Sequence, residues 1–261
     1  MLRTLSICGA ISRVTFSEIL RDKVLYGALV ICALLLGFGA LLSRVSFVKP
    51  DRILLDYGLL ALAVTSGFLA TLAGAVVLLR EFERRTVFIA LARPISRLEF
   101  VVGKFLGVAG VLFLNAVVLS LGFLGILKFF AVDGGLFSPT LFEALFLLPL
   151  QACVLAALAL FFASFSTPSL SILMTLGLYL VGVNLSHLRF LAQKAQDPVE
   201  RAVLETLALV LPNFEHFNWG LRVSYGLPVP ATYLATALSY AFIWIALLLM
   251  GAGMCLEGRE N

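Results

Sequence analysis

The chain has 261 residues, of which 61% are hydrophobic and only 13% are charged, and its mean hydropathy is +1.06. Soluble globular proteins carry about a quarter charged residues. The composition therefore excludes a soluble enzyme or a nucleic-acid-binding domain, in spite of the net charge of +4. The four cysteines are scattered without a CxxC pair, which indicates apolar packing rather than a metal site or a disulfide.

Long apolar runs predict an all-α polytopic membrane protein. A helix of about 17–25 apolar residues crosses about 30 Å of hydrocarbon and pairs its own backbone groups. We expect a single transmembrane domain over residues 1–261. Its six predicted spans are residues 24–42, 57–79, 105–129, 141–162, 169–185 and 233–256.

The distribution of lysine and arginine predicts the orientation. With the N-terminus in the cytoplasm, eleven of the nineteen basic residues lie inside and eight lie outside. The inner set includes the dense cluster at residues 80–104, close to the membrane ends where the positive-inside rule is strongest. We therefore expect a multi-pass protein of the bacterial inner membrane with both termini in the cytoplasm.

Residues 2–22 precede the first predicted span and have their own pattern. Arg3, Arg13 and Arg21, with two serines between them, recur at helical spacing and form one polar stripe, while apolar residues cover much of the other side. This pattern is typical of an amphipathic helix that lies in the cytoplasmic interface. The alternative is a simple extension of the first span.

The predicted cytoplasmic loop at residues 80–104 joins the second and third spans. Its charged residues open a short helical stretch that Pro94 breaks. Ser96 can then cap the next helix, and Glu99 at the third position completes a capping box.

The long outer loop, residues 186–232, contains a strong helix start. Asp197 is an N-cap acid, Pro198 occupies the first helical position and Glu200 the third. We expect this helix to run to Leu211, where Pro212 stops it. It is too apolar for a free helix in water, so we expect it to dip toward the membrane or to lie on it.

The sequence lacks the residues that would drive transport or catalysis within this chain. It has no GxxxxGK[ST] phosphate loop and no HExxH motif, and the predicted spans carry almost no charge. Asn115, Gln151 and Asn184 are the strong polar side chains within spans, and helix–helix hydrogen bonds explain them best. A stand-alone secondary transporter or channel is the alternative, but it needs a charged or strongly polar midplane. An intramembrane enzyme needs clustered catalytic side chains, and none is visible.

The cytoplasmic loop and the topology together resemble the permease subunit of ABC-2-type transporters. The family pattern runs roughly Glu-x-x-x-Gly-Thr, then Pro-x-Ser-Arg, then Gly-Lys into the third span. The chain has Arg85 where the family usually has glycine. The stretch from Leu211 to Asn218 is similar to a Pro-Asn-x-Glu-x-Phe-Asn sequence before the last span of some members. The matching loop residues are Glu81, Glu83, Thr86, Leu91, Pro94, Ser96, Arg97, Gly103 and Lys104.

This resemblance implies a non-catalytic membrane subunit of an exporter. ATP would be bound by a separate ATP-binding subunit, so no cofactor is expected on this chain. A second permease copy or a homologous permease would complete the substrate path, with membrane lipids around it and no nucleic acid. Members move lipids, glycans, peptides, drugs or ions, so the substrate stays open. The implied ATPase-coupling residues are Glu81, Glu83, Arg84, Thr86, Pro94, Arg97 and Lys104, beside the interfacial helix with Arg3, Arg13 and Arg21.

Overall fold

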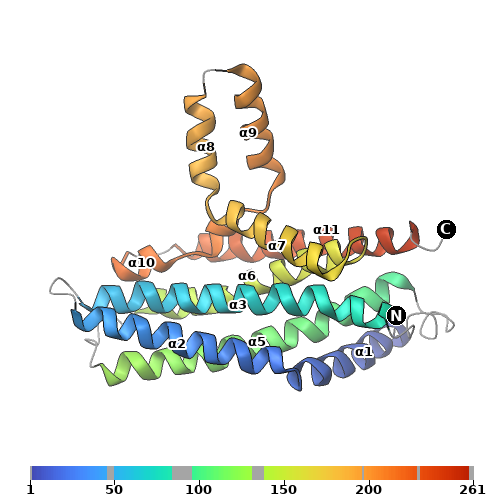
Figure 1. Ribbon diagram of the computed structural model, residues 1–261, viewed down its shortest axis with the longest axis horizontal. Helices are drawn as coiled ribbons and strands as arrows, with labels where there is room; N and C mark the ends of the chain where they lie inside the picture. The colour runs from blue at the N-terminus through green and yellow to red at the C-terminus, as the bar shows by residue number, and fades with distance from the viewer. Residues whose placement is uncertain are drawn as a thin grey trace.

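The computed structural model describes residues 2–45, 50–83, 96–130, 138–195, 197–227 and 230–258. All regular secondary structure in these segments is helical, which confirms the all-α prediction. Five long helices run roughly side by side and form a bundle (Figure 1). They are α2 (Lys23–Val45), α3 (Pro50–Glu83), α5 (Arg97–Phe129), α6 (Pro139–Ala163) and α11 (Ala231–Gly258).

Each of the five is long and apolar enough to cross a membrane. The predicted fifth span differs from a straight helix. It consists of α7 (Pro168–Val183) and α8 (Leu185–Lys194), which meet at an angle of 66°. The described residues therefore contain five helices that could span a membrane, or six if this bent pair counts as one span. The apolar run at 169–185 predicts a helix, but no residue in it predicts the bend. Asn184 lies at the bend, and asparagine is equally common at the end of a straight helix.

The core lies around α6, most of whose side chains are buried. Glycines allow α3 to approach its neighbours closely: a Cβ at Gly74 would lie 2.6 Å from the carbonyl oxygen of Ala156 on α6. At the other end of α3, a Cβ at Gly58 would overlap the Phe123 ring of α5. Small residues on α3 therefore allow close helix–helix packing.

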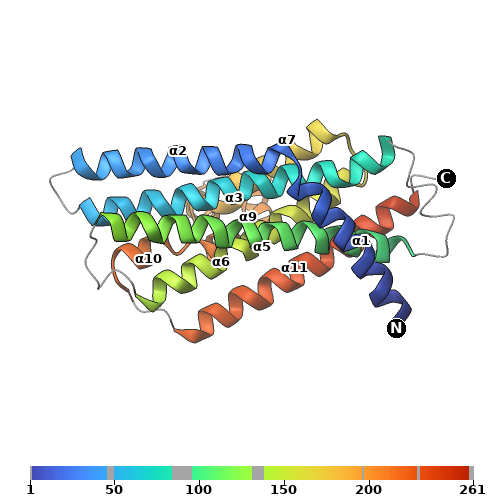
Figure 2. The ribbon, with the colours of Figure 1, turned by 90° about the horizontal axis from the view of Figure 1, so that it is seen from below.

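The amphipathic segment forms α1 (Leu2–Leu20), a helix separate from α2. The two meet at a turn at Arg21 and Asp22, and α1 crosses α5 at an oblique angle (Figure 2). The interpretation as an extension of the first span is therefore wrong. Gly103 and Gly107 of α5 face α1, where Cβ atoms would lie 2.9 Å from Ile11 Cβ and 2.6 Å from Thr15 Cβ.

The outer loop is almost entirely helical. After α8 come α9 (Pro198–Val210), a 3₁₀ turn η2 (Phe214–Phe217) and the short α10 (Gly220–Ser224). The predicted helix start is confirmed: Asp197 caps α9 by accepting a hydrogen bond from the backbone N–H of Val199 at 3.0 Å, and Pro198 is the first helical residue. The helix ends at Val210, with Leu211 as its C-cap before Pro212.

Candidate functional site

The candidate coupling residues that the structure describes lie toward one end of the bundle. The end of α3, the start of α5 and both chain termini lie there together (Figure 1). Glu81 and Glu83 continue the last turns of α3, although only their backbone is described. Arg84, Thr86 and Pro94 fall outside the described residues, so their predicted role stays a prediction.

Arg97 links two helices that are far apart in the sequence. Its Nη1 donates a hydrogen bond to the carbonyl oxygen of Leu256, at 3.1 Å, in the last turns of α11. The predicted capping box is present just before it: Ser96 Oγ accepts from the Glu99 N–H at 3.2 Å, and Glu99 Oε2 accepts from the Ser96 N–H at 3.0 Å. The start of α5 is therefore fixed both locally and to the C-terminal helix.

Lys104 lies two turns into α5 and is only 3% exposed. Its ammonium group lies 5.7 Å from the centre of the Phe100 ring, within the range of a cation–π contact. Lys104 is therefore buried within the bundle rather than part of an open surface.

The predicted interfacial helix exposes its basic stripe. Arg13 and Arg21 are both exposed, whereas Cys8, Thr15 and Ile19 on the other side are buried. Cys8 Sγ also donates to the backbone carbonyl of Glu99, at 3.5 Å. The backbone at Arg3 belongs to α1, and its side chain is not described. The amphipathic character of this helix is thus confirmed.

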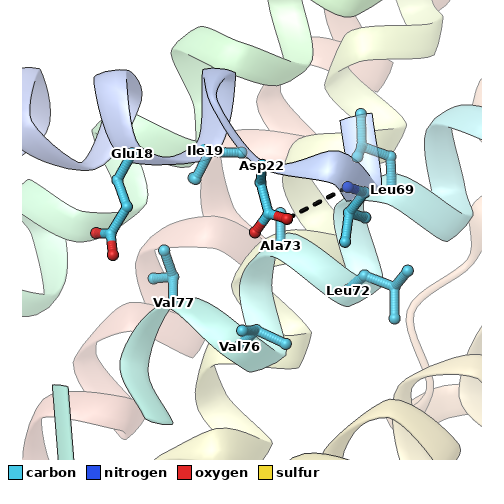
Figure 3. Close-up of a pocket in the computed structure, with 9 residues that line it drawn as sticks. Glu18, Ile19, Asp22, Leu69, Leu72, Ala73, Val76 and Val77 are labelled. Atoms are coloured by element: carbon cyan, nitrogen blue, oxygen red, sulfur yellow. Dashed lines mark hydrogen bonds between the residues drawn. The ribbon is translucent and has the colours of Figure 1, made fainter. Parts of the chain in front are cut away.

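A small pocket lies where the α1–α2 turn packs on α3 (Figure 3). Its volume is about 60 Å³, and apolar α3 residues such as Leu69, Ala73 and Val77 form one wall. Glu18 and Asp22 line the opposite wall, and Asp22 Oδ1 accepts a hydrogen bond from the Val24 N–H at 3.3 Å. The pocket is large enough for ordered water only. Sequence reasoning missed these two acids, whose i, i+4 spacing was the available signal.

The three amides of the spans have different environments. Gln151 Nε2 donates to the Tyr179 hydroxyl at 2.8 Å, which confirms a helix–helix bond between α6 and α7. Asn184 instead donates to the Leu180 carbonyl of its own helix, at 2.9 Å, because the bend frees that carbonyl. Asn115 is buried, and its amide atoms have no partner among the described residues.

The Pro-Asn-x-Glu-x-Phe-Asn stretch holds the α7–α8 bend in place. Glu215 Oε1 accepts from the Ser186 N–H at 2.7 Å, which caps the start of α8. The Asn213 N–H donates to the Tyr240 hydroxyl of α11 at 2.6 Å. Phe214 packs against Tyr179 at 5.4 Å between ring centres, and a Cβ at Gly182 would overlap the Phe214 ring. We call Asn213, Phe214 and Glu215 the outer clamp.

The described residues contain no group of three or more His, Cys, Asp or Glu side chains that could hold a metal ion.

A model of the ABC-2 family transporter protein family matches residues 10–255. The chain belongs to the ABC-2 transporter family. A search of curated proteins found no match. The ABC-2 family consists of membrane subunits of ABC transporters, so this chain is a multi-pass membrane transport subunit.

Proposed function

We propose that the chain is the permease subunit of an ATP-driven ABC exporter, which works as a dimer with separate ATP-binding subunits in the bacterial inner membrane. Membership of the ABC-2 family supports the permease assignment. The positive-inside bias of residues 80–104 supports a cytoplasmic position for both termini.

One observation supports the coupling of this chain to an ATP-binding subunit. The end of α3, the start of α5, the start of α1 and the end of α11 share one end of the bundle (Figures 1 and 2). A subunit that docks at this end contacts the loop and the interfacial helix at the same time. The tight α1–α5 contact at Gly103 and Gly107, together with the Arg97–Leu256 hydrogen bond, makes this end a connected unit. Movement of the docked subunit is then transmitted to α1, α5 and α11 together, because closely packed interfaces shift as bodies rather than deform.

The test uses the purified chain alone and together with an ATP-binding subunit encoded beside it. The sequence has no phosphate loop, so we expect the purified chain neither to bind nor to hydrolyse ATP. Co-expression should yield a stable complex with ATPase activity. Hydrolysis by the single chain, free of contaminants, would contradict the proposal.

A further inference from the structure

Asn115 lies in the core of the bundle with its hydrogen-bonding capacity unused. It is 3% exposed, and neither its amide nitrogen nor its amide oxygen has a partner among the described residues. A side-chain amide can donate two hydrogen bonds and accept two. Leaving a buried polar group unpaired costs more than a typical hydrogen bond contributes, and no bulk water reaches the centre of a membrane helix. Asn115 therefore marks a position where a hydrogen-bonding ligand would be stabilised.

Thr65 of α3 lies opposite Asn115 in the antiparallel α3–α5 pair. A Cβ at Gly58 would overlap the Phe123 ring, and this contact fixes the register of the two helices. Thr65 follows Gly58 by seven residues, which is two helical turns, so it lies on the same side of α3. Asn115 precedes Phe123 by eight residues, so it lies at the same level on α5. Both residues are therefore near the centres of their spans.

The hydroxyl of Thr65 has the same unused capacity. Thr65 is 1% exposed, and its Oγ1 has no hydrogen-bond partner among the described residues. Thr71, on the same helix, shows the usual solution, because its hydroxyl donates to the Gly67 carbonyl at 2.9 Å. Thr65 and Asn115 thus form a pair of buried polar side chains that their own helices leave unpaired.

The pocket at the α1–α2 turn reaches the same side of α3. Leu69 and Leu72 line it, and Leu69 lies four residues beyond Thr65, or about 6 Å along the helix axis. Glu18 and Asp22 give the pocket a polar wall (Figure 3). Its volume of about 60 Å³ exceeds the roughly 10–15 Å³ that one water molecule requires. A polar space of sufficient size therefore lies about one helical turn from the Thr65–Asn115 pair.

The chemistry of the pair favours water over an ion. Both side chains are neutral, so neither a cation nor an anion finds an opposite charge beside them. Together they offer donors and acceptors, and their burial restricts the ligand to a very small one. Buried water molecules typically make about three hydrogen bonds to polar groups that would otherwise be unpaired.

We propose that Thr65 and Asn115 bind ordered water at mid-membrane level, and that this water exchanges with bulk water through the pocket lined by Glu18 and Asp22. The bound water joins α3 to α5 through hydrogen bonds that the two side chains do not make directly. The site lies inside one chain and needs neither a second copy nor an ATP-binding subunit. Its test is therefore independent of the proposed function.

Oxidation during X-ray radiolysis of the chain in nanodiscs tests for this water, because radiolysis converts bound water into hydroxyl radicals that oxidise the nearest side chains. Cys32 is the probe. It is fully buried on α2. A Cβ at Gly39 would lie 3.1 Å from Tyr57 Cβ, so in this antiparallel pair Cys32, seven residues before Gly39, lies level with residue 64. Cys153, 3% exposed in α6, is the matched control. We expect Cys32 to be oxidised at least tenfold faster than Cys153, and equal rates would overturn the proposal.

Two variants test the residues that bind the water. Asn115→Leu and the nearly isosteric Thr65→Val each remove polar atoms, and each should slow the oxidation of Cys32 at least fivefold without changing that of Cys153. Thr65→Val keeps the test decisive if Asn115→Leu fails to fold. An unchanged rate at Cys32 in the folded variants would show that these side chains do not hold the water.

A third variant tests the route of exchange. Ala73→Leu fills the pocket, which Ala73 lines, and Gly122→Leu is the control because nothing lies within 4 Å of a Cβ at Gly122. The chain is mixed rapidly with ¹⁸O-labelled water before irradiation, and the ¹⁸O content of oxidised Cys32 is measured against mixing time. We expect Ala73→Leu to delay the appearance of ¹⁸O at least fivefold and Gly122→Leu to leave it unchanged. An unchanged delay in Ala73→Leu would overturn the route through this pocket.

Discussion

At the scale of single residues, two glycines on α5 distinguish the effect of helix packing on stability from the effect of helix propensity. A Cβ at Gly107 would lie 2.6 Å from Thr15 Cβ and 2.8 Å from the Ser12 carbonyl oxygen, whereas nothing lies within 4 Å of a Cβ at Gly122. Overpacking costs about 1–3 kcal/mol. We therefore expect Gly107→Leu to lower the thermal midpoint in detergent and Gly122→Leu to leave it unchanged or raise it. Equal effects of both substitutions would show that α1 does not rest on α5 at this site.

Cys8 reports on the same contact. Burial and the nearby Glu99 carboxylate both raise the pKa of its thiol above its ordinary value, so the unreactive protonated form dominates at neutral pH. In a variant that keeps Cys8 as its single cysteine, maleimide should react slowly at pH 7. The rate should keep rising to a higher pH than the rate of free cysteine does, because the thiolate forms only as the pH passes this raised pKa. A plateau below pH 8 would contradict a buried thiol, and Gly107→Leu should accelerate the reaction by exposing it.

At the scale of elements, the outer clamp decides whether α8 keeps its bend. Glu215 caps the start of α8, whereas Glu205 forms an exposed ion pair with Arg201 on α9. We expect Glu215→Ala to loosen the start of α8 and to speed tryptic cleavage at Arg189 or Lys194 in detergent. Glu205→Ala is the matched control and should cleave as slowly as the wild type. Equal cleavage of both variants would mean that the clamp does not hold the bend.

The elements that the sequence predicts best are those set by local chemistry. The apolar runs, the Ser96–Glu99 capping box and the Asp197-Pro198 helix start each depend on neighbouring residues, and all three are confirmed. The bend after Val183 depends on contacts from far along the chain, chiefly Glu215 to Ser186 and Phe214 to Gly182. No local pattern contains those contacts, so a straight fifth span was the natural prediction.

The candidate site was predictable to the same limited extent. The capping box and the basic loop mark the start of α5, but the bond from Arg97 to the Leu256 carbonyl joins residues 159 positions apart. Lys104 is buried, on a helix whose Gly103 and Gly107 lie against α1. Charge patterns predict an exposed loop there, and only tertiary packing distinguishes a docking residue from a supporting one.

At the scale of the whole molecule, the account predicts that one end of the bundle faces the cytoplasm and the other end faces the outside. The end of α3 and the start of α5 lie at the same end of the bundle as both termini, and the end of α2 and the start of α3 lie at the other end (Figure 1). Cysteine placed at Arg93 should be labelled only from the cytoplasm, and cysteine placed at Lys194 only from outside. Labelling of both positions from the same side would contradict the topology.

The central claim is that the inner end of this permease docks on a separate ATP-binding subunit, and charge reversal at the end of α3 tests it most directly. If the charged residues around Glu81 and Glu83 only fix the orientation in the membrane, then Glu81→Lys/Glu83→Lys adds positive charge on the cytoplasmic side. This change should leave membrane insertion unchanged or improve it. If they face a docked subunit, like charges across the interface cost several kcal/mol, and each 1.4 kcal/mol is about tenfold in affinity.

The measurement is co-purification of the ATP-binding subunit with this double variant, with Glu205→Lys on α9, away from this end of the bundle, as the matched charge control. The account predicts normal insertion and expression of both variants, loss of the ATP-binding subunit from the Glu81→Lys/Glu83→Lys permease, and full retention by the control. Unchanged co-purification and transport with the double variant would contradict docking at this end of the bundle.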